Sequence, residues 1–347
     1  MIKETLYFIH QKFQKIFTNK LILGIIFIVY LILSFTIMIN HEIWTDEAQA
    51  WEIARNLSIP EIIHQMRYEG HPCLWHFILM PFAKLGFPVI TMNIISWFLV
   101  SLSIYIILFH SKWHLFVKFI VILNPTFIYF LSAIARSYSL IPLCLSLLAI
   151  LYPNRKQHPF LYTNILGILA HTHIVMCGFV GIAAILFLLE YIGTWKENKK
   201  TCITIFLLLM IYFILLSIVI FPSLTECSII SHEGLTFLKI YDTLISISTF
   251  FFPYITHMGP LFCIVILLIC FCTFCFNKKL FIILVVSILT FFGIHLFWPF
   301  TLLERTCIIF AIIVCINLYN DKIFFQIIVL FISICSMKMN YSLIIYD

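Results

Sequence analysis

Long apolar segments recur along the whole chain and restrict its fold more than any other feature. Segments such as 21–40 and 201–221 exceed the roughly 17 residues that a helix needs to cross the ~30 Å hydrocarbon core of a bilayer. Of the 347 residues, 63% are hydrophobic and 10% are charged, whereas soluble domains have about 45–50% apolar and about 25% charged residues. The chain is therefore predicted to be an all-α, polytopic integral membrane protein. No linker or repeat is visible, so residues 1–347 are expected to form one domain.

Basic residues in the short connections predict the orientation, because Lys and Arg are enriched on the cytoplasmic side. The basic clusters are Lys3/Lys12/Lys15/Lys20, Lys112/Lys118, Arg155/Lys156, Lys196/Lys199/Lys200, Lys278/Lys279 and Lys322. Placing them inside predicts about eleven transmembrane helices, within a range of roughly 9–13. The expected spans are 21–40, 88–110, 117–134, 138–153, 159–176, 178–194, 201–221, 258–276, 280–299, 306–319 and 323–337.

The ends of this topology need three further assignments. Residues 1–20 become a cytoplasmic tail, which has the charge of a signal peptide but no small-residue cleavage site, so the apolar run after it is kept as the first helix. The apolar piece 72–87 would reach only about 24 Å as a helix. It is expected to be half-inserted or interfacial, and 241–256 is treated in the same way.

Two short helices are predicted in the first outer loop, residues 41–87. Thr45 is expected to be the N-cap of the first, which places Asp46 and Glu47 in a first turn where the helix dipole stabilises their negative charge. The sequence Ser58-Ile59-Pro60-Glu61 fits a capping box that begins a second helix ending before Gly70.

Most of the polar side chains suited to chemistry fall on the outer face in this topology. They include Asp46, Glu47, Glu52, Arg55, Glu61, Arg67, Glu69, His71, Lys84, Arg136, His171, His173, Glu233, Lys239, Glu304, Arg305 and Lys338. Ionised side chains at a membrane are costly unless they are paired or used. This one-sided distribution is typical of an enzyme working at the outer leaflet, and it also fits a receptor or a transporter vestibule.

Short motifs on the outer face are similar to those of a known superfamily. Asp46-Glu47 follows the first predicted helix, Glu69–Trp75 (EGHPCLW) closes the first outer loop, Ala135–Leu140 (ARSYSL) lies in the second, and Arg305 follows Trp298-Pro299-Phe300. From about residue 21 to residue 310, this order resembles the polyprenyl-phosphate-sugar-dependent glycosyltransferases of the GT-C superfamily. That superfamily includes protein O-mannosyltransferases and lipid A aminoarabinose transferases. The combination with a His-rich fifth helix end also resembles a less characterised bacterial branch.

The resemblance implies a GT-C-like fold and a specific reaction. The enzyme would move a sugar from a polyprenyl-phosphate donor to a glycan, lipid or protein acceptor at the outer face of the cell inner or plasma membrane, with membrane lipids and no nucleic acid as partners. Two departures concern the acceptor and metal dependence. Cys73 replaces the second Pro of the family's His-Pro-Pro pattern, and no acidic residue follows Arg136 closely.

The reaction itself assigns roles to the outer-face residues. A carboxylate suits deprotonation of the acceptor, so Asp46 is the candidate base and Glu47 is its alternate or a substrate or metal partner. Arg binds phosphate oxygens in a bidentate manner, which makes Arg136 and Arg305 the phosphate candidates; snorkelling to lipid headgroups is their simpler alternative. Further substrate-binding candidates are Gln49, His71, Tyr138, His171 and His173.

No cofactor is required by these roles, although a divalent cation is an alternative. Asp46 or Glu47 could share such an ion with His71 and with His171 and His173, since histidine and carboxylate favour these ions. His171 and His173 are two apart and reach one ion only where the backbone is not helical. The Cys residues in apolar runs are expected to be buried hydrophobes. A transporter or flippase and a non-catalytic envelope-polysaccharide subunit remain alternatives to the enzyme.

Overall fold

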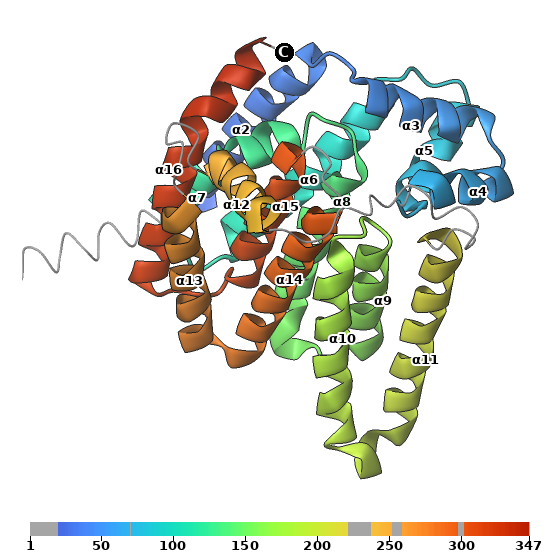
Figure 1. Ribbon diagram of the computed structural model, residues 1–347, viewed down its shortest axis with the longest axis vertical. Helices are drawn as coiled ribbons and strands as arrows, with labels where there is room; N and C mark the ends of the chain where they lie inside the picture. Colours follow the sequence, from blue (N-terminus) through green and yellow to red (C-terminus); the bar gives the residue numbers. More distant parts are fainter. Residues whose placement is uncertain (1–19, 70, 221–236, 252–258, 298–301, 347) are drawn as a thin grey trace, which may run out of the picture.

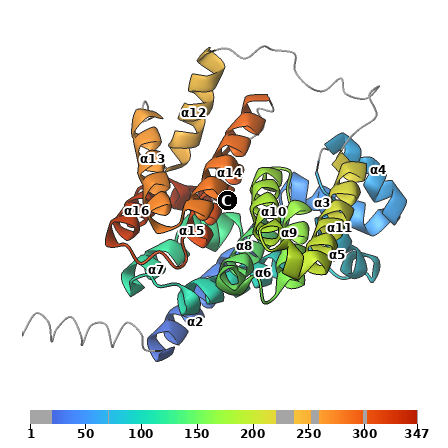
Figure 2. The same ribbon diagram turned by 90° about the horizontal axis from the view of Figure 1, so that it is seen from below.

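The computed structural model describes residues 20–69, 71–220, 237–251, 259–297 and 302–346, and their secondary structure is entirely helical. The longer helices are α2 (Lys20–Asn40), α6 (Thr91–His110), α10 (Met176–Ile192), α11 (Trp195–Ile220), α13 (Gly259–Phe276), α14 (Lys278–Phe297) and α16 (Ile323–Tyr346). The shorter ones are α3 (Thr45–Asn56), α4 (Ile59–Glu69), α5 (Leu74–Lys84), α7 (Leu115–Ile122), α8 (Leu140–Leu151), α9 (Pro159–Ala170), α12 (Phe237–Phe251) and α15 (Leu302–Ile316). Figure 2 shows α12–α16 gathered on one side of the molecule and α3, α4, α5 and α11 on the other.

Apolar helices dominate the described chain and confirm the coarse prediction of an all-α protein compatible with a membrane. Among the described residues, four helical stretches are long and apolar enough to cross a bilayer: 20–40, 91–110, 137–154 and 195–220. Two of them, α2 and α11, keep most of their apolar side chains outside the core, as Ile28 and Phe213 illustrate. Large exposed apolar surfaces indicate contact with lipid or a partner. The count of eleven spans stays a prediction.

The expected helix 117–134 is interrupted, which corrects that span. α7 ends at Ile122, and after Asn124 and Pro125 the chain forms one π-helical turn, Thr126–Phe130. Pro125 has no N–H to donate and cannot continue a helix ladder. The Asn124 side chain accepts the Thr126 N–H at 3.0 Å and donates to Ser336 Oγ at 2.8 Å. The buried Asn124 amide therefore stabilises the interruption of the helix by bonding both to the π-helical turn and to α16.

The short helices of the first loop confirm most of the prediction for that segment. Glu61 accepts the Ser58 N–H at 2.7 Å, which is one of the two bonds of the predicted capping box, and it also accepts the Ser58 Oγ–H at 2.6 Å. As expected, α4 ends at Glu69. The N-cap of α3 is Trp44 rather than Thr45, because Trp44 has an extended backbone and its N–H donates to the Glu47 carboxylate at 2.9 Å. Asp46 and Glu47 lie in the first turn as expected.

Connections that carry the predicted cytoplasmic charges meet one another. The Lys112 N–H donates to the Leu318 carbonyl at 3.1 Å, which joins the α6–α7 and α15–α16 connections. Arg155, before α9, and Lys279, in α14, both contact Glu190 near the end of α10. In Figure 1, α3 and α4 lie at the other end of α10 from its junction with α11. These contacts join connections that carry the predicted cytoplasmic charges, while the alternating topology and the side of the membrane stay predictions.

Candidate functional site

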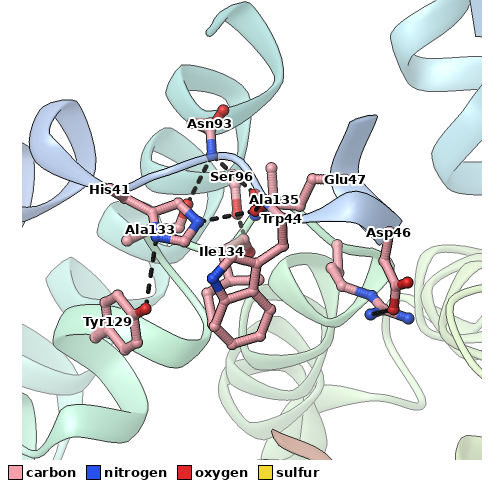
Figure 3. Close-up of polar contacts among 11 residues, drawn as sticks. His41, Trp44, Asp46, Glu47, Asn93, Ser96, Tyr129, Ala133, Ile134 and Ala135 are labelled. Carbon is pink, nitrogen blue, oxygen red and sulfur yellow. Dashed lines mark hydrogen bonds and ion pairs between the residues drawn. The ribbon is translucent and has the colours of Figure 1, made fainter. Parts of the chain in front are cut away.

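Glu47 is the hub of a buried polar network between α3, α6 and the chain before Arg136 (Figure 3). Its side chain is fully enclosed. Oε1 accepts the Ala135 N–H at 2.6 Å and the Asn93 amide at 2.9 Å. Oε2 accepts the Trp44 N–H at 2.9 Å and the His41 Nε2–H at 2.8 Å. Burial of a carboxylate is tolerated only with such compensation, so these four donors fix the start of α3 against residue 135.

Polar residues of α6 hold the segment that leads to Arg136. The Asn93 amide also donates to the Ala133 carbonyl at 2.9 Å, so both of its hydrogens are used. Ser96 Oγ donates to the Leu131 carbonyl at 3.2 Å and contacts the Ser139 hydroxyl. This segment is non-helical and buried, and its carbonyls would otherwise lack partners. The network therefore fixes the backbone position from which the Arg136 side chain extends.

Asp46 and Arg136 form an ion pair on the outer side of this network (Figure 3). The Arg136 side chain is 18% exposed, whereas that of Asp46 is 57% exposed. The guanidinium carbon of Arg136 also lies 5.3 Å from the centre of the Tyr138 ring, within the range of a cation–π contact. Although the two residues are 90 positions apart, the structure brings them together as the sequence hypothesis requires.

Aromatic rings continue the site beyond Arg136. The centres of the Tyr138 and His173 rings lie 5.2 Å apart in an edge-to-face arrangement, and the centre of the His71 ring also lies 5.2 Å from that of His173. The chain thus brings together Asp46, Arg136, Tyr138, His173 and His71 from four separate segments. Tyr138 and His173 are buried and His71 is half-buried, so these rings pack beside the guanidinium and position it.

His171 is separated from that row, although its neighbour His173 belongs to it. α9 ends at Ala170 instead of continuing to the expected residue 176, so the two histidines lie in an irregular turn. His171 Nε2 lies 3.1 Å from the Tyr212 carbonyl of α11, and burial lowers the pKa of this imidazole. His173 Nδ1 accepts the Val175 N–H at 3.2 Å. The two side chains face different partners.

Within the described ranges, no three His, Cys, Asp or Glu side chains are grouped closely enough to hold a metal ion. Glu47, one of the candidate ligands, has both oxygens occupied by the four donors above. Asp46 is paired with Arg136. The predicted divalent site therefore gains no support from the arrangement of these carboxylates.

Two other predicted residues lie outside the central cluster. Gln49 is exposed on α3. Arg305 belongs to the first turn of α15, and its side chain lies outside the described part of the structure, as does residue 70 and the sequence 298–301 before that helix. Residues 1–19 of the predicted cytoplasmic tail, Glu233 and positions 252–256 of the expected interfacial piece 241–256 also fall outside it.

Four contributors to the site were missed by sequence reasoning: His41, Asn93, Ser96 and Tyr129. Tyr129 contacts His41 from the π-helical turn, with 3.5 Å between Oη and Nδ1. A signal did exist for Asn93 and Ser96, because polar residues inside an apolar helix are functional candidates by default. Nothing in the spacing of His41 or Tyr129 indicates that they meet.

The exposed carboxylate and the half-buried guanidinium define what the site can do chemically. Asp46 can accept a proton from a nucleophile, and Arg136 can bind an anion through its planar fork. No protein-family model, curated protein or solved structure matches the chain. The capability of the site is therefore judged from these residues and the rings beside them.

Proposed function

We propose that this protein is a membrane glycosyltransferase that moves a sugar from a polyprenyl-phosphate donor to a hydroxyl of a glycan, lipid or protein acceptor at the outer face of the membrane. The observation that carries the proposal is the contact between the exposed Asp46 carboxylate and the Arg136 guanidinium. A base next to an anion-binding group is what such a transfer needs, since one end of the reaction loses a proton and the other gains negative charge.

The reaction balances with these two residues. The acceptor oxygen forms a bond to the anomeric carbon of the sugar and gives its proton to Asp46. The bond between the anomeric carbon and the phosphate oxygen breaks, and its electron pair leaves with polyprenyl phosphate. Arg136 stabilises the charge that develops on that phosphate, and such preorganised electrostatic stabilisation is a major contribution in enzymes. The proton on Asp46 is then released to water.

The ion pair between Asp46 and Arg136 means that binding of the donor phosphate would also release the Asp46 carboxylate. Arg136 has Asp46 as its partner. A phosphate that takes the Arg136 fork replaces that carboxylate, and Asp46 then turns to the acceptor. The buried Tyr138 and His173 rings pack beside Arg136 and help to orient its guanidinium, and the half-buried His71 next to them is retained as a sugar-binding candidate. Arg305 is retained as a second phosphate candidate on the grounds of its sequence motif.

Glu47 is assigned a positioning role instead of the base role. All four of its hydrogen bonds are internal and its side chain has no exposed surface. A base must come within hydrogen-bond reach of the proton that it removes. Asp46, with more than half of its side chain exposed, meets that condition, and Glu47 holds the backbone on both sides of the pair.

The test compares donor consumption by Asp46→Asn with that of the natural protein. Proteoliposomes are supplied with polyprenyl-phosphate hexoses and an envelope extract as acceptor, and the donor is followed by mass spectrometry. General-base catalysis contributes about 10²–10⁴-fold, so Asp46→Asn is expected to slow consumption by about that factor. Glu52→Gln is the matched control, because Glu52 is a similarly exposed carboxylate on the same helix.

Equal rates for Asp46→Asn and the natural protein would remove the base assignment. A transporter would move the lipid-linked sugar across the proteoliposome membrane with no loss of the sugar–phosphate bond, and a non-catalytic subunit would leave the donor both intact and in place. Arg136→Lys separates binding from chemistry. It keeps the charge but loses the bidentate fork, so affinity for polyprenyl phosphate is expected to fall while Glu52→Gln leaves it unchanged.

A further inference from the structure

The end of the bundle that lies away from Asp46 and Arg136 contains a cavity that the proposed transfer does not use. Its volume is about 260 Å³, and it lies between α8, the start of α9, α10 and the helices α13–α15. The walls are mainly apolar and include Leu148, Ala149, Phe179, Ile283 and Ile316. Sites for whole small ligands measure about 300–1,000 Å³, so this cavity suits an apolar segment of a larger molecule.

A fixed cationic group stands at the edge of this cavity. Arg155 is one of the lining residues, and its guanidinium binds Glu190 through two hydrogen bonds of 3.1 and 2.6 Å. The same group lies 4.1 Å from the centre of the Tyr152 ring. The amine of Lys279 shares the Glu190 carboxylate. Two cations and one carboxylate leave this cluster with one unbalanced positive charge.

The neighbouring residues add to that positive charge. Lys156 follows Arg155, and Lys278 precedes Lys279; both are exposed. In the predicted topology these connections face the cytoplasmic leaflet, whose anionic lipids attract basic residues beside a membrane. An apolar cavity with a cationic edge is complementary to a molecule that has an apolar chain and an anionic head.

We propose that this cavity binds one acyl chain of an anionic membrane phospholipid, with the lipid phosphate held by Arg155 and Lys279. Arg155 keeps two N–H groups for a phosphate. Glu190 accepts one hydrogen each from Nε and Nη2, and the Tyr152 carbonyl accepts one from Nη1, which leaves one hydrogen on each terminal nitrogen. Inorganic phosphate has the same anionic group as the lipid head, but it has no apolar chain to fill the cavity. The site is separate from the transfer site, and its occupancy does not depend on the proposed reaction.

The test measures lipid retention by the purified full-length protein in detergent. Native mass spectrometry follows titration with dioleoylphosphatidylglycerol, dioleoylphosphatidylcholine or inorganic phosphate. Ala149→Phe fills the cavity and is expected to weaken phosphatidylglycerol retention by about tenfold or more. Leu147→Phe is the matched control, since Leu147 is on the same helix but does not line the cavity. Ala149→Leu is a smaller filling variant for use if Ala149→Phe does not fold.

Lys279→Gln tests the headgroup part of the proposal. A basic residue near a membrane surface contributes about 1 kcal/mol, so the preference for phosphatidylglycerol over phosphatidylcholine is expected to fall about fivefold. Equal retention by the filling variants and Leu147→Phe would overturn the proposal. Equal affinity of the natural protein for the two lipids would also overturn it, as would thermal stabilisation by inorganic phosphate that matches the stabilisation by phosphatidylglycerol.

Discussion

At the scale of single residues, two adjacent carboxylates occupy opposite environments. Asp46 is largely exposed and faces Arg136, whereas Glu47 is enclosed by four donors from three parts of the chain. Consecutive residues in a helix point about 100° apart, so one first turn presents one carboxylate outward and the other inward. The two adjacent carboxylates therefore have different roles: Asp46 forms a surface ion pair, and Glu47 anchors the start of α3 from inside.

Glu47→Gln is expected to destabilise the protein severely. Each carboxylate oxygen accepts two hydrogen bonds, so the amide nitrogen of Gln would face two donors wherever it is placed. Breaking a buried charged network costs about 3–5 kcal/mol. Unfolding in denaturant, followed by circular dichroism, measures this change. Glu52→Gln is expected to stay within about 0.5 kcal/mol, and a similarly small loss for Glu47→Gln would contradict the anchor role.

His76 of α5 is expected to make stability depend on acidity. Burial lowers the pKa of this imidazole to about 4 from an ordinary value of 6.5. The unfolded chain then binds more protons between these values, so stability is complete above pH 6.5 and falls as the pH drops toward 4. The loss is on the order of 3 kcal/mol, at about 1.4 kcal/mol per pKa unit.

Thermal unfolding between pH 7 and pH 4 checks the role of His76. His76→Leu is expected to reduce the acid-induced drop in melting temperature, because it removes the group that must take up a proton. His64→Leu, at an exposed histidine on the adjacent helix α4, is expected to leave that drop unchanged. An identical acid response in both variants would refute the assignment.

At the scale of elements, the points where helices end determine the position of the site residues. α7 stops before Pro125, and α9 stops at Ala170 before its histidines. The Pro125 break could be anticipated, because proline lacks the N–H that a helix ladder needs. The end of α9 carries no such signal. His171 there contacts the Tyr212 carbonyl, a partner 41 positions away that local propensity does not include.

Gly167→Ala tests how tightly α9 packs on α11. A Cβ at Gly167 would collide with the Tyr212 ring, whereas one at Gly181 of α10 meets no atom within 4 Å. Overpacking typically costs about 1–3 kcal/mol, so Gly167→Ala is expected to lower stability by that amount. Gly181→Ala, the control, is expected to be neutral or stabilising by up to about 1 kcal/mol. Rescue of Gly167→Ala by Tyr212→Leu would identify the ring as the cause, and an unchanged melting temperature for Gly167→Ala alone would contradict the contact.

At the scale of the whole molecule, polar connections are sorted to two ends. The loop helices α3–α5, the turn after α9 and the segment before α8 meet around Arg136, and the Lys-rich connections meet around Glu190 and Leu318. Such sorting follows from a membrane, because charged side chains avoid its apolar centre. The predicted topology and the contacts between connections are in agreement on this point.

Cysteine labelling in intact cells tests the predicted sides. Asn56, the last residue of α3, and Gln157, before α9, are both exposed, and each is replaced by Cys in turn. A membrane-impermeant maleimide is expected to label Asn56→Cys directly and Gln157→Cys only after permeabilisation. The natural protein, with its own cysteines, provides the background. Labelling of both variants in intact cells would contradict the orientation.

The sequence by itself determined the class of this protein, its apolar helices, the place of Asp46 and Glu47 in the first turn of α3 and the contact between Ser58 and Glu61, since these depend on composition and near neighbours. Only the tertiary structure decided that Asp46 meets Arg136 and that His173, but not His171, joins His71 and Tyr138. Those contacts join residues up to about one hundred positions apart, and their geometry depends on how whole helices pack. Local patterns define the helices, whereas packing selects which polar residues share a site.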